Sequence, residues 1–253
     1  HVQVPEVAIT QITSWLPQSL PAPVRQYLKE ALTQGTAQSV TAQMSGRLAD
    51  FPFTQKGSGQ FRISGLVRGV KFNTVPKSLQ PSSETGEWPV LQDLSGELVF
   101  DRASVKLSRV KTRVAQAPGM VWSDLEAQIA QLDKAVVNVR AAGKGPLNDA
   151  LKFWKASPLN GYTDRALDSA QAQGGVDLRM NLGIPIDKPE ATQANGWVTF
   201  SGNDISLGQV GPNLTRVRGG LRFTANGFEL NNVQALLWGG EARIEGEIGR
   251  AHV

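Results

Sequence analysis

Cysteine is absent from the 253-residue sequence, and the only histidines, His1 and His252, lie at its two ends. Disulfides, thiolate metal sites and cysteine nucleophiles are therefore excluded. An interior without histidine also lacks the side chain that proteins use most often as a general base and as a metal ligand. These absences argue against zinc enzymes and against hydrolases that depend on a catalytic histidine.

Long apolar runs are absent as well. A helix needs about 20 consecutive apolar residues to cross a bilayer, and the sequence contains no such stretch. The N-terminus also lacks the charged, apolar and small-residue zones of a signal peptide. The sequence begins and stops within a pattern, since a predicted strand at residues 241–248 almost reaches the last residue. We therefore expect a piece of a longer protein, whose targeting or anchoring segment lies outside this chain.

Charge is nearly balanced, with 26 basic against 22 acidic residues and a net charge of +4. A surplus of this size fits an anionic surface, but it is also common among proteins without a charged partner. Nucleic acid is not an expected partner, because the aromatic residues do not interleave with the basic ones as single-strand binding requires.

Two helices are predicted. In residues 21–35, apolar residues recur at helical spacing, prolines stand near the start, and Gly35 is expected to cap the end. In residues 146–156, one face carries Leu147, Ala150, Leu151 and Trp154. Between strands, residues 75–88 are rich in proline, serine and glycine, which predicts an exposed loop.

Most of the remaining sequence alternates apolar and polar residues in short stretches punctuated by glycine, which predicts strands. Two stretches match position for position: residues 91–110 and 214–233 each follow the pattern L-x-x-[LV]-x-G-x-L-x-F, a turn, and [VF]-x-L. This match predicts a repeated hairpin, with convergence on common hairpin sequences as the alternative. Asn226-Gly227 is the strongest turn signal in the sequence.

Repeating hairpins favour an elongated, curved antiparallel sheet that grows by addition of strands, rather than a closed sandwich. We expect a mainly β protein in which the two amphipathic helices pack against this sheet. The expected order is a helical entry over residues 15–35, a first hairpin-sheet unit over 36–145, a helical insertion over 146–173 and a second hairpin-sheet unit over 174–253. All four belong to a single β-rich segment.

No residue set completes a catalytic or cofactor motif. Residues 108–111 match S-x-x-K, but the accompanying motifs of serine-type penicillin-binding enzymes are missing and the match falls in a predicted strand. The glycine-rich residues 57–59 and 143–145 complete neither a dinucleotide nor a phosphate-loop pattern. We therefore expect no catalytic residue, no metal ion and no cofactor, and we do not expect an enzyme.

The candidate binding residues are apolar residues that alternate along the predicted strands and would line one face of the sheet. They are Phe61, Ile63, Leu94, Leu98, Phe100, Val105, Leu107, Leu221, Phe223, Phe228 and Leu230. The same residues would form an ordinary core if the two helices pack over that face, and this alternative stays open.

Basic residues follow the apolar ones along one predicted strand. Arg109, Lys111 and Arg113 alternate after Val105 and Leu107, so the five would share a face that begins apolar and ends basic. Such a basic rim beside an apolar face could hold lipid phosphates. A solvated strand end is the alternative.

Several short landmarks follow one another along nearly the whole chain. They are L-P at residues 16–17 and 20–21, G-R-L-A-D-F-P-F at 46–53, G-Q-F at 59–61, W-P at 88–89 followed by L-S-G-E-L-V-F-D-R at 94–102, S-P-L at 157–159 and G-G-L-R-F at 219–223. In this order they resemble the central region of the YhdP family, which are large AsmA-like proteins of the Gram-negative envelope.

The resemblance implies a periplasmic segment of a protein anchored in the inner membrane. It also implies a long curved sheet with an apolar concave face, or β-groove, that carries phospholipid acyl chains towards the outer membrane. Phospholipid is then the expected partner, and no bond is broken.

A second hypothesis is a structural module of the cell envelope that binds a protein partner through its sheet edges. An enzyme acting on envelope polymers is a third, and it would need polar residues that converge in a pocket.

Overall fold

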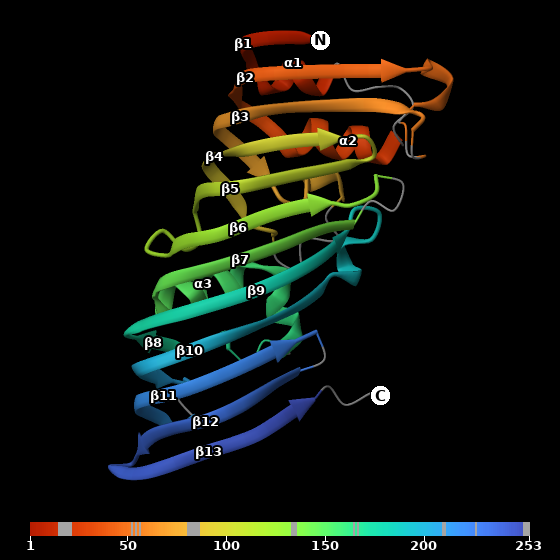
Figure 1. The fold of residues 1–253 in the computed structure, drawn as a ribbon. Coiled ribbons are helices and arrows are strands. Elements are labelled where there is room, and N and C mark those ends of the chain that lie inside the picture. The colour runs from red at the N-terminus through yellow and green to blue at the C-terminus, as the bar shows by residue number, and fades with distance from the viewer. Residues whose placement is uncertain are drawn as a thin grey trace.

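The computed structural model describes residues 1–14, 22–51, 53, 55, 57–79, 87–132, 136–163, 165, 167–208, 211–225 and 227–249. Its main feature is one open antiparallel sheet of 13 strands, in which each strand pairs with its neighbours in chain order from β1 to β13. Only the short β8 departs from this order, since it pairs with β10 beside β9. The first and last strands, β1 and β13, therefore lie at opposite ends of a tall, twisted sheet (Figure 1).

The strands are β1 (Val2–Ala8), β2 (Leu32–Gly46), β3 (Gly59–Asn73), β4 (Val90–Asp101), β5 (Ser104–Val114), β6 (Val121–Ile129), β7 (Val136–Pro146), β8 (Gln171–Gln173), β9 (Gly175–Pro185), β10 (Gln193–Ser206), β11 (Asn213–Thr224), β12 (Gly227–Leu237) and β13 (Gly240–Gly249). The predicted fold class, a mainly β protein with an elongated, curved antiparallel sheet and a few helices, is confirmed.

Three α-helices, α1 (Ile9–Ser14), α2 (Ala22–Ala31) and α3 (Leu147–Ala156), all lie behind the sheet in Figure 1. We call the sheet face that they contact the inner face. Short 3-10 helices, η1 (Leu48–Asp50), η2 (Lys77–Leu79), η4 (Pro158–Thr163) and η5 (Pro189–Ala191), lie in the connections between strands. No helix is drawn beside β12 and β13 within the described part of the chain.

The second predicted helix is confirmed as α3, which follows Pro146. The first is wrong at its C-terminal end, because α2 stops at Ala31 and β2 begins at the next residue. Gly35 therefore does not cap a helix. It lies in β2 with a φ of 110°, where an added Cβ would come within 2.7 Å of the Val70 Cα on β3. This close approach of two strands requires a glycine.

The loop predicted at residues 75–88 is wrong in part. Its described ends are buried, with Val75 and Trp88 each less than 5% exposed and η2 between them, while residues 80–86 lie outside the described residues. The proline-punctuated entry around Trp15 and Leu16, the helix start at Pro21 and the turn residue Asn226 also lie outside them. Neither β1 nor α1 is indicated by a clear period in the sequence.

The repeated hairpin is present as β4–β5 and β11–β12. Leu98 pairs with Leu107 and Phe100 with Val105 in the first copy. At the equivalent positions of the second copy, Leu221 pairs with Leu230 and Phe223 with Phe228. Identical register in both copies favours a true repeated unit over convergence on turn sequences.

A row of β-bulges crosses most of the sheet. Non-glycine residues take a positive φ in β2, β4, β5, β6, β11 and β12, namely Ser39, Asp93, Arg109, Asp124, Arg216 and Asn232. Gly69 and Gly202 take that conformation in β3 and β10. A shift in strand register accompanies each of them. Bulges bend strands and increase their twist, so this row explains the curvature of the sheet.

The D-F-P-F motif closes the end of the β2–β3 hairpin. Phe53 is fully buried and stacks on two glycines, where a Cβ on Gly46 or Gly59 would come within 2.8 Å of its ring. Phe51 adds an edge-on contact to Phe61, with 5.0 Å between the ring centres. The motif therefore has a packing role at this hairpin.

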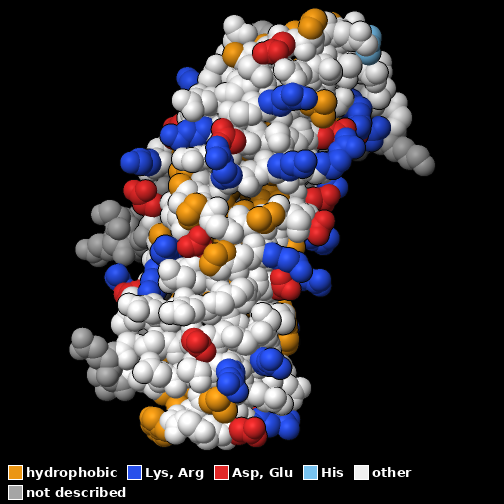
Figure 2. Space-filling view, turned by 90° about the vertical axis from the view of Figure 1, so that its left-hand side faces the viewer, with side chains coloured by type: hydrophobic (Ala, Val, Ile, Leu, Met, Phe, Trp, Pro, Cys, Tyr) orange, Lys and Arg blue, Asp and Glu red, His pale blue; other side chains and the backbone are white. Residues whose placement is uncertain are grey.

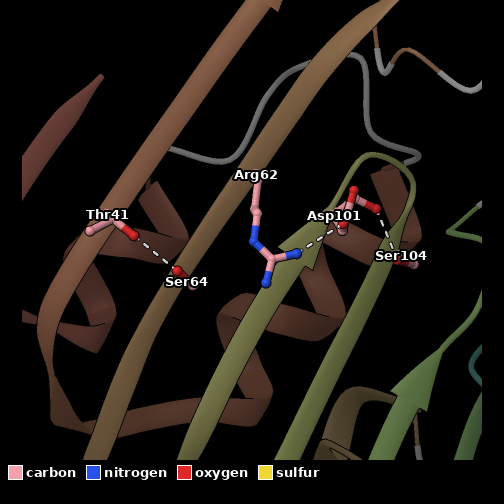
Figure 3. A network of polar contacts seen from close by, with 5 residues as sticks. All are labelled: Thr41, Arg62, Ser64, Asp101 and Ser104. Carbon is pink, nitrogen blue, oxygen red and sulfur yellow. Dashed lines mark hydrogen bonds and ion pairs between the residues drawn. The ribbon is translucent and has the colours of Figure 1, made fainter. Parts of the chain in front are cut away.

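Polar pairs link neighbouring strands on the outer face. Figure 3 shows Arg62 reaching Asp101 across β3 and β4, with 3.0 Å between Nη1 and Oδ2, and Thr41 beside Ser64, with 2.9 Å between the hydroxyls. Both members of the ion pair remain more than 40% exposed, so solvent screens the attraction.

We expect Arg62→Ala to lower the free energy of unfolding by less than about 1 kcal/mol, because exposed ion pairs contribute little. Urea unfolding monitored by circular dichroism measures this change. A loss well above that value, compared with Asp101→Ala and the double variant, would mean that this pair is coupled to the sheet more strongly than its exposure indicates.

Candidate functional site

Inward-facing side chains form apolar rows that run across the strands, along the length of the sheet. One row crosses β2 to β9 through Ala42, Ile63, Phe100, Val105, Ile129, Val137 and Ile184. A second crosses β3 to β10 through Gly65, Leu98, Leu107, Ala127, Val139, Leu182 and Ala194.

A third row crosses β6 to β13 through Trp122, Gly143, Leu178, Val198, Leu221, Leu230 and Gly246. Every position in the three rows is apolar or glycine. At a spacing of about 4.8 Å between strands, the rows together make an apolar surface about 50 Å long.

The first part of this surface is a pocket beside α2. Tyr27 and Leu28 of α2 form one wall, and the sheet forms the other with Val67, Val70, Leu94, Leu98, Val105, Leu107, Ala127, Ile129 and Val137. The cavity between these walls has a volume of about 70 Å³. We call this site the N-terminal pocket.

The last part of the surface is more open. On β10 to β12, the inward side chains Val198, Phe200, Leu221, Phe228 and Leu230 are only half-buried, and we call this group the C-terminal open face. Phe223 is the exception: it is 5% exposed because Trp154 of α3 meets it edge-on, with 5.4 Å between the ring centres.

Between these two parts the surface is closed. The five inward side chains of β9, Val176, Leu178, Met180, Leu182 and Ile184, are all only 4–8% exposed. Helix α3 packs against β7, β8 and β9 at this point, and Phe153 lies against Trp122 of β6.

The structure brings the predicted binding residues together in two groups. Leu94, Leu98, Val105 and Leu107 line the N-terminal pocket, and Ile63 and Phe100 lie in the row beside them. Leu221, Phe228, Leu230 and the covered Phe223 lie at the C-terminal open face. Phe61 stands apart at the end of β3, against Phe51.

Core packing accounts for part of this set. Leu94, Phe100, Val105 and Phe223 are less than 9% exposed, as expected if helices pack over the face. Phe61, Ile63, Leu98, Leu107, Leu221, Phe228 and Leu230 keep an accessible surface and are the stronger candidates for contact with a ligand.

The predicted basic rim is wrong in its geometry. The bulge at Arg109, with a φ of 54°, reverses the alternation of β5, so that Val110 and Val114 are buried while Arg109, Lys111 and Arg113 are exposed. Arg109 pairs with Glu97 and Arg113 with Asp93, and Lys111 lies opposite Ser95. These basic residues therefore lie on the outer face, behind Val105 and Leu107.

Figure 2 shows basic and acidic side chains close together over one long side of the molecule, where Lys and Arg lie among Asp and Glu around small hydrophobic patches.

The sequence analysis did not identify the wall of the pocket that α2 supplies. It also did not identify the inward residues that β6, β7 and β9 contribute to the apolar rows. The strands β6 and β7 were predicted, but their inward residues Ala127, Ile129 and Val137 were not identified as binding candidates. The alternation of apolar residues in these strands can be recognised in the sequence, whereas the position of α2 over Leu98 depends on tertiary packing.

Tyr27 anchors α2 over the pocket. Its hydroxyl donates a hydrogen bond to the Thr74 carbonyl, with 3.0 Å between the oxygens. Nearby, the Asn73 side chain donates to the Glu30 carbonyl and the Ser78 hydroxyl donates to the Glu30 carboxylate. This last bond is the main cause that lowers the pKa of Glu30. Burial raises the pKa of the Tyr27 hydroxyl above its ordinary value.

We expect Tyr27→Phe to lower the free energy of unfolding by about 1 kcal/mol at pH 8, where the lost hydrogen bond is the main change. The folded-state pKa of Tyr27 lies above the unfolded value near 10, so the wild-type protein loses stability as the pH rises from the unfolded towards the folded value. The difference between the two proteins should therefore shrink above pH 10. Urea unfolding at pH 8 and pH 10.5 checks this, and a constant difference would contradict it.

Within the described residues, no helix is long and apolar enough to span a membrane, and no three His, Cys, Asp or Glu side chains gather where they could hold a metal ion.

Comparison with known proteins agrees with these features. The family described as YhdP protein matches residues 2–252. The intermembrane phospholipid transporter YhdP of Escherichia coli (strain K12) is 28% identical over 197 residues, which cover 78% of this chain and 14% of that protein. No solved structure gives a significant match. Because the family match covers nearly the whole chain, the chain belongs to the YhdP family.

Proposed function

We propose that the apolar inner face binds phospholipid acyl chains, and that this chain is a periplasmic section of a conduit for phospholipid between the inner and outer membranes. The observation that carries the proposal is the set of three overlapping apolar rows, which extend from β2 to β13 without a charged side chain. The relative in Escherichia coli is named an intermembrane phospholipid transporter, and this chain corresponds to a small share of its length.

The physical reason is the cost of exposing acyl chains to water. Each methylene group transferred from water to an apolar surface contributes about 0.8 kcal/mol, so a lipid tail gains several kcal/mol over even part of its length. Contacts of this kind have no directional requirement. A chain can therefore slide from row to row while its headgroup stays in solvent, and no bond needs to be broken. Anchoring in the inner membrane would come from another segment of the whole protein.

Photocrosslinking tests the proposal directly. A photoreactive amino acid at Leu98 or at Leu221 should capture phospholipid in cells, and the purified chain should carry phospholipid that mass spectrometry detects after extraction. Val99, the outer-face neighbour of Leu98, is the matched control position and should capture none. Absence of lipid at both inner positions would refute the conduit for this segment.

A scaffold that binds another envelope protein is the second candidate. The strands β1 and β13 each pair on one side only within the described sheet, so their outer edges offer backbone hydrogen-bonding groups. Capture of one defined protein at edge positions, together with no lipid at Leu98 and Leu221, would favour this function over lipid binding.

A further inference from the structure

We propose that α3 and η4 form a displaceable plug, and that this plug leaves the inner face when a lipid passes between the N-terminal pocket and the C-terminal open face. The inference rests on the proposed function and adds to it a movement of α3 and η4. Exposure differs along the rows. Leu98 and Leu107 at one end and Leu221 and Leu230 at the other are only half-buried, whereas the inward side chains of β9 are buried.

The plug closes the apolar surface at its middle. Phe153 contacts Trp122 on β6, which belongs to the third row, and Trp154 contacts Phe223 on β11, so α3 reaches from one side of β9 to the other. Leu159 of η4 is 1% exposed and packs into the same apolar cluster. An acyl chain that follows the rows meets these side chains, which occupy the surface that it needs.

Between α3 and the inner face, contact is made by apolar groups that a lipid tail can replace. The directional bonds lie at the two ends of the helix. At the N-terminal end, the Leu147 amide donates a hydrogen bond to the Gly174 carbonyl, with 2.9 Å between the atoms, and Asp149 accepts one from the Gly119 amide, with 2.8 Å between the atoms. At the other end, the Glu87 amide donates to the Ala156 carbonyl and the Lys155 ammonium to the Ala170 carbonyl. Few bonds must therefore break for the helix to move.

Two polar groups also weaken the closed state. The indole N–H groups of Trp122 and Trp154 are buried and have no acceptor among the described residues. Both side chains belong to the contact between the plug and the sheet. A buried donor without a partner destabilises the arrangement that buries it. Displacement of the plug would expose these donors to water or to lipid oxygens.

A disulfide can lock the plug, and because this chain contains no cysteine, an introduced pair would form the only disulfide within it. A Cβ added at Gly119 would lie 2.7 Å from the Asp149 Oδ2, and Gly119 is not among the residues with a positive φ. Gly119→Cys with Asp149→Cys should therefore join α3 to the β5–β6 connection. Thr41→Cys with Ser64→Cys is the matched control, because it links β2 and β3 on the outer face, away from α3.

The readout is lipid capture by photocrosslinkers at Leu98 and Leu221 in cells that produce the whole protein containing this chain. With the plug locked, capture should fall at least fivefold at one of the two positions and persist at the other, and a reductant should restore it. The control disulfide should change neither. Unchanged capture at both positions would overturn the plug, whereas no capture in the unlocked protein would instead refute the proposed function.

Hydrogen exchange of the unmodified chain provides an independent measurement if the locked variant does not fold. Backbone amides of α3 should exchange at least tenfold faster than those of β7 and β9, because a ten-residue helix that has left the sheet is only marginally stable in water, whereas the sheet stays folded. Equal protection of α3 and these strands would overturn the proposal.

Discussion

Leu98→Asp should lower the affinity of the chain for phospholipid at least tenfold. Leu98 lines the N-terminal pocket, is half-buried, and belongs to the second apolar row. A carboxylate there keeps its hydration only if no acyl chain covers it, because burial of an unpaired charge is costly. The lipid would then either avoid this part of the surface or remove water from the charge.

The measurement is equilibrium binding of a fluorescent phospholipid to the purified chain. Val99→Asp is the matched control, because Val99 faces outwards and lies opposite Lys106, where a carboxylate gains a favourable neighbour. That variant should bind lipid as the wild type does. Equal loss in both variants would indicate a general disturbance of the sheet, and equal retention would contradict binding at the inner face. A tenfold change corresponds to about 1.4 kcal/mol.

Asn203→Leu should lower the free energy of unfolding by at least about 3 kcal/mol, well beyond the effect of Arg62→Ala or Tyr27→Phe. Asn203 is fully buried beside the bulge of β10. Its Oδ1 accepts from the Ser201 amide at 2.9 Å, and its Nδ2 donates to the carbonyls of Gln173 and Gly175 at 3.1 and 2.8 Å. Leucine would remove the partner of one backbone amide and two backbone carbonyls, and the loss of each of these part-buried hydrogen bonds costs roughly 1 kcal/mol.

Urea unfolding measures this effect, and Asn181→Leu provides the comparison. Asn181 is exposed and bonds only to the Asn195 side chain, so its loss should change stability by no more than about 0.5 kcal/mol. Similar losses for the two variants would mean that Asn203 does not hold β8, β9 and β10 together. The predicted loss is large against the usual total of about 5–15 kcal/mol.

The alternation of apolar residues was sufficient to predict the sheet and its repeated hairpins. In Leu94, Gly96, Leu98 and Phe100 the period of two is unbroken, so their shared face could be assigned from the sequence. Four of the predicted binding residues consequently line one pocket.

The errors arise where the backbone departs from the regular period. Arg109 is an ordinary polar residue in sequence, yet its positive φ moves every following residue of β5 to the opposite face. Only a glycine such as Gly69 marks a bulge recognisably in the sequence, because left-handed conformations favour glycine. The same limit explains why Arg109, Lys111 and Arg113 were assigned to the wrong face.

Tertiary packing decided the remaining differences. Helical spacing continues through Leu32, but pairing of Leu32 with Phe72 on β3 ends α2 and begins β2. Sequence patterns also identified α3 as amphipathic without indicating that it lies across the middle of the apolar surface, since that position depends on contacts with Trp122 and Phe223.

The order of the strands has a consequence for how the protein is made. Each strand of the main path pairs with its predecessor in the sheet, from β1 to β13, so no part of this sheet waits for a distant segment of the chain. Low contact order of this kind favours fast folding. During synthesis, the N-terminal hairpins can therefore form before later residues have emerged, and each new hairpin pairs with an edge strand that is already in place. Such vectorial assembly would also shorten the time for which the apolar rows are exposed to aggregation.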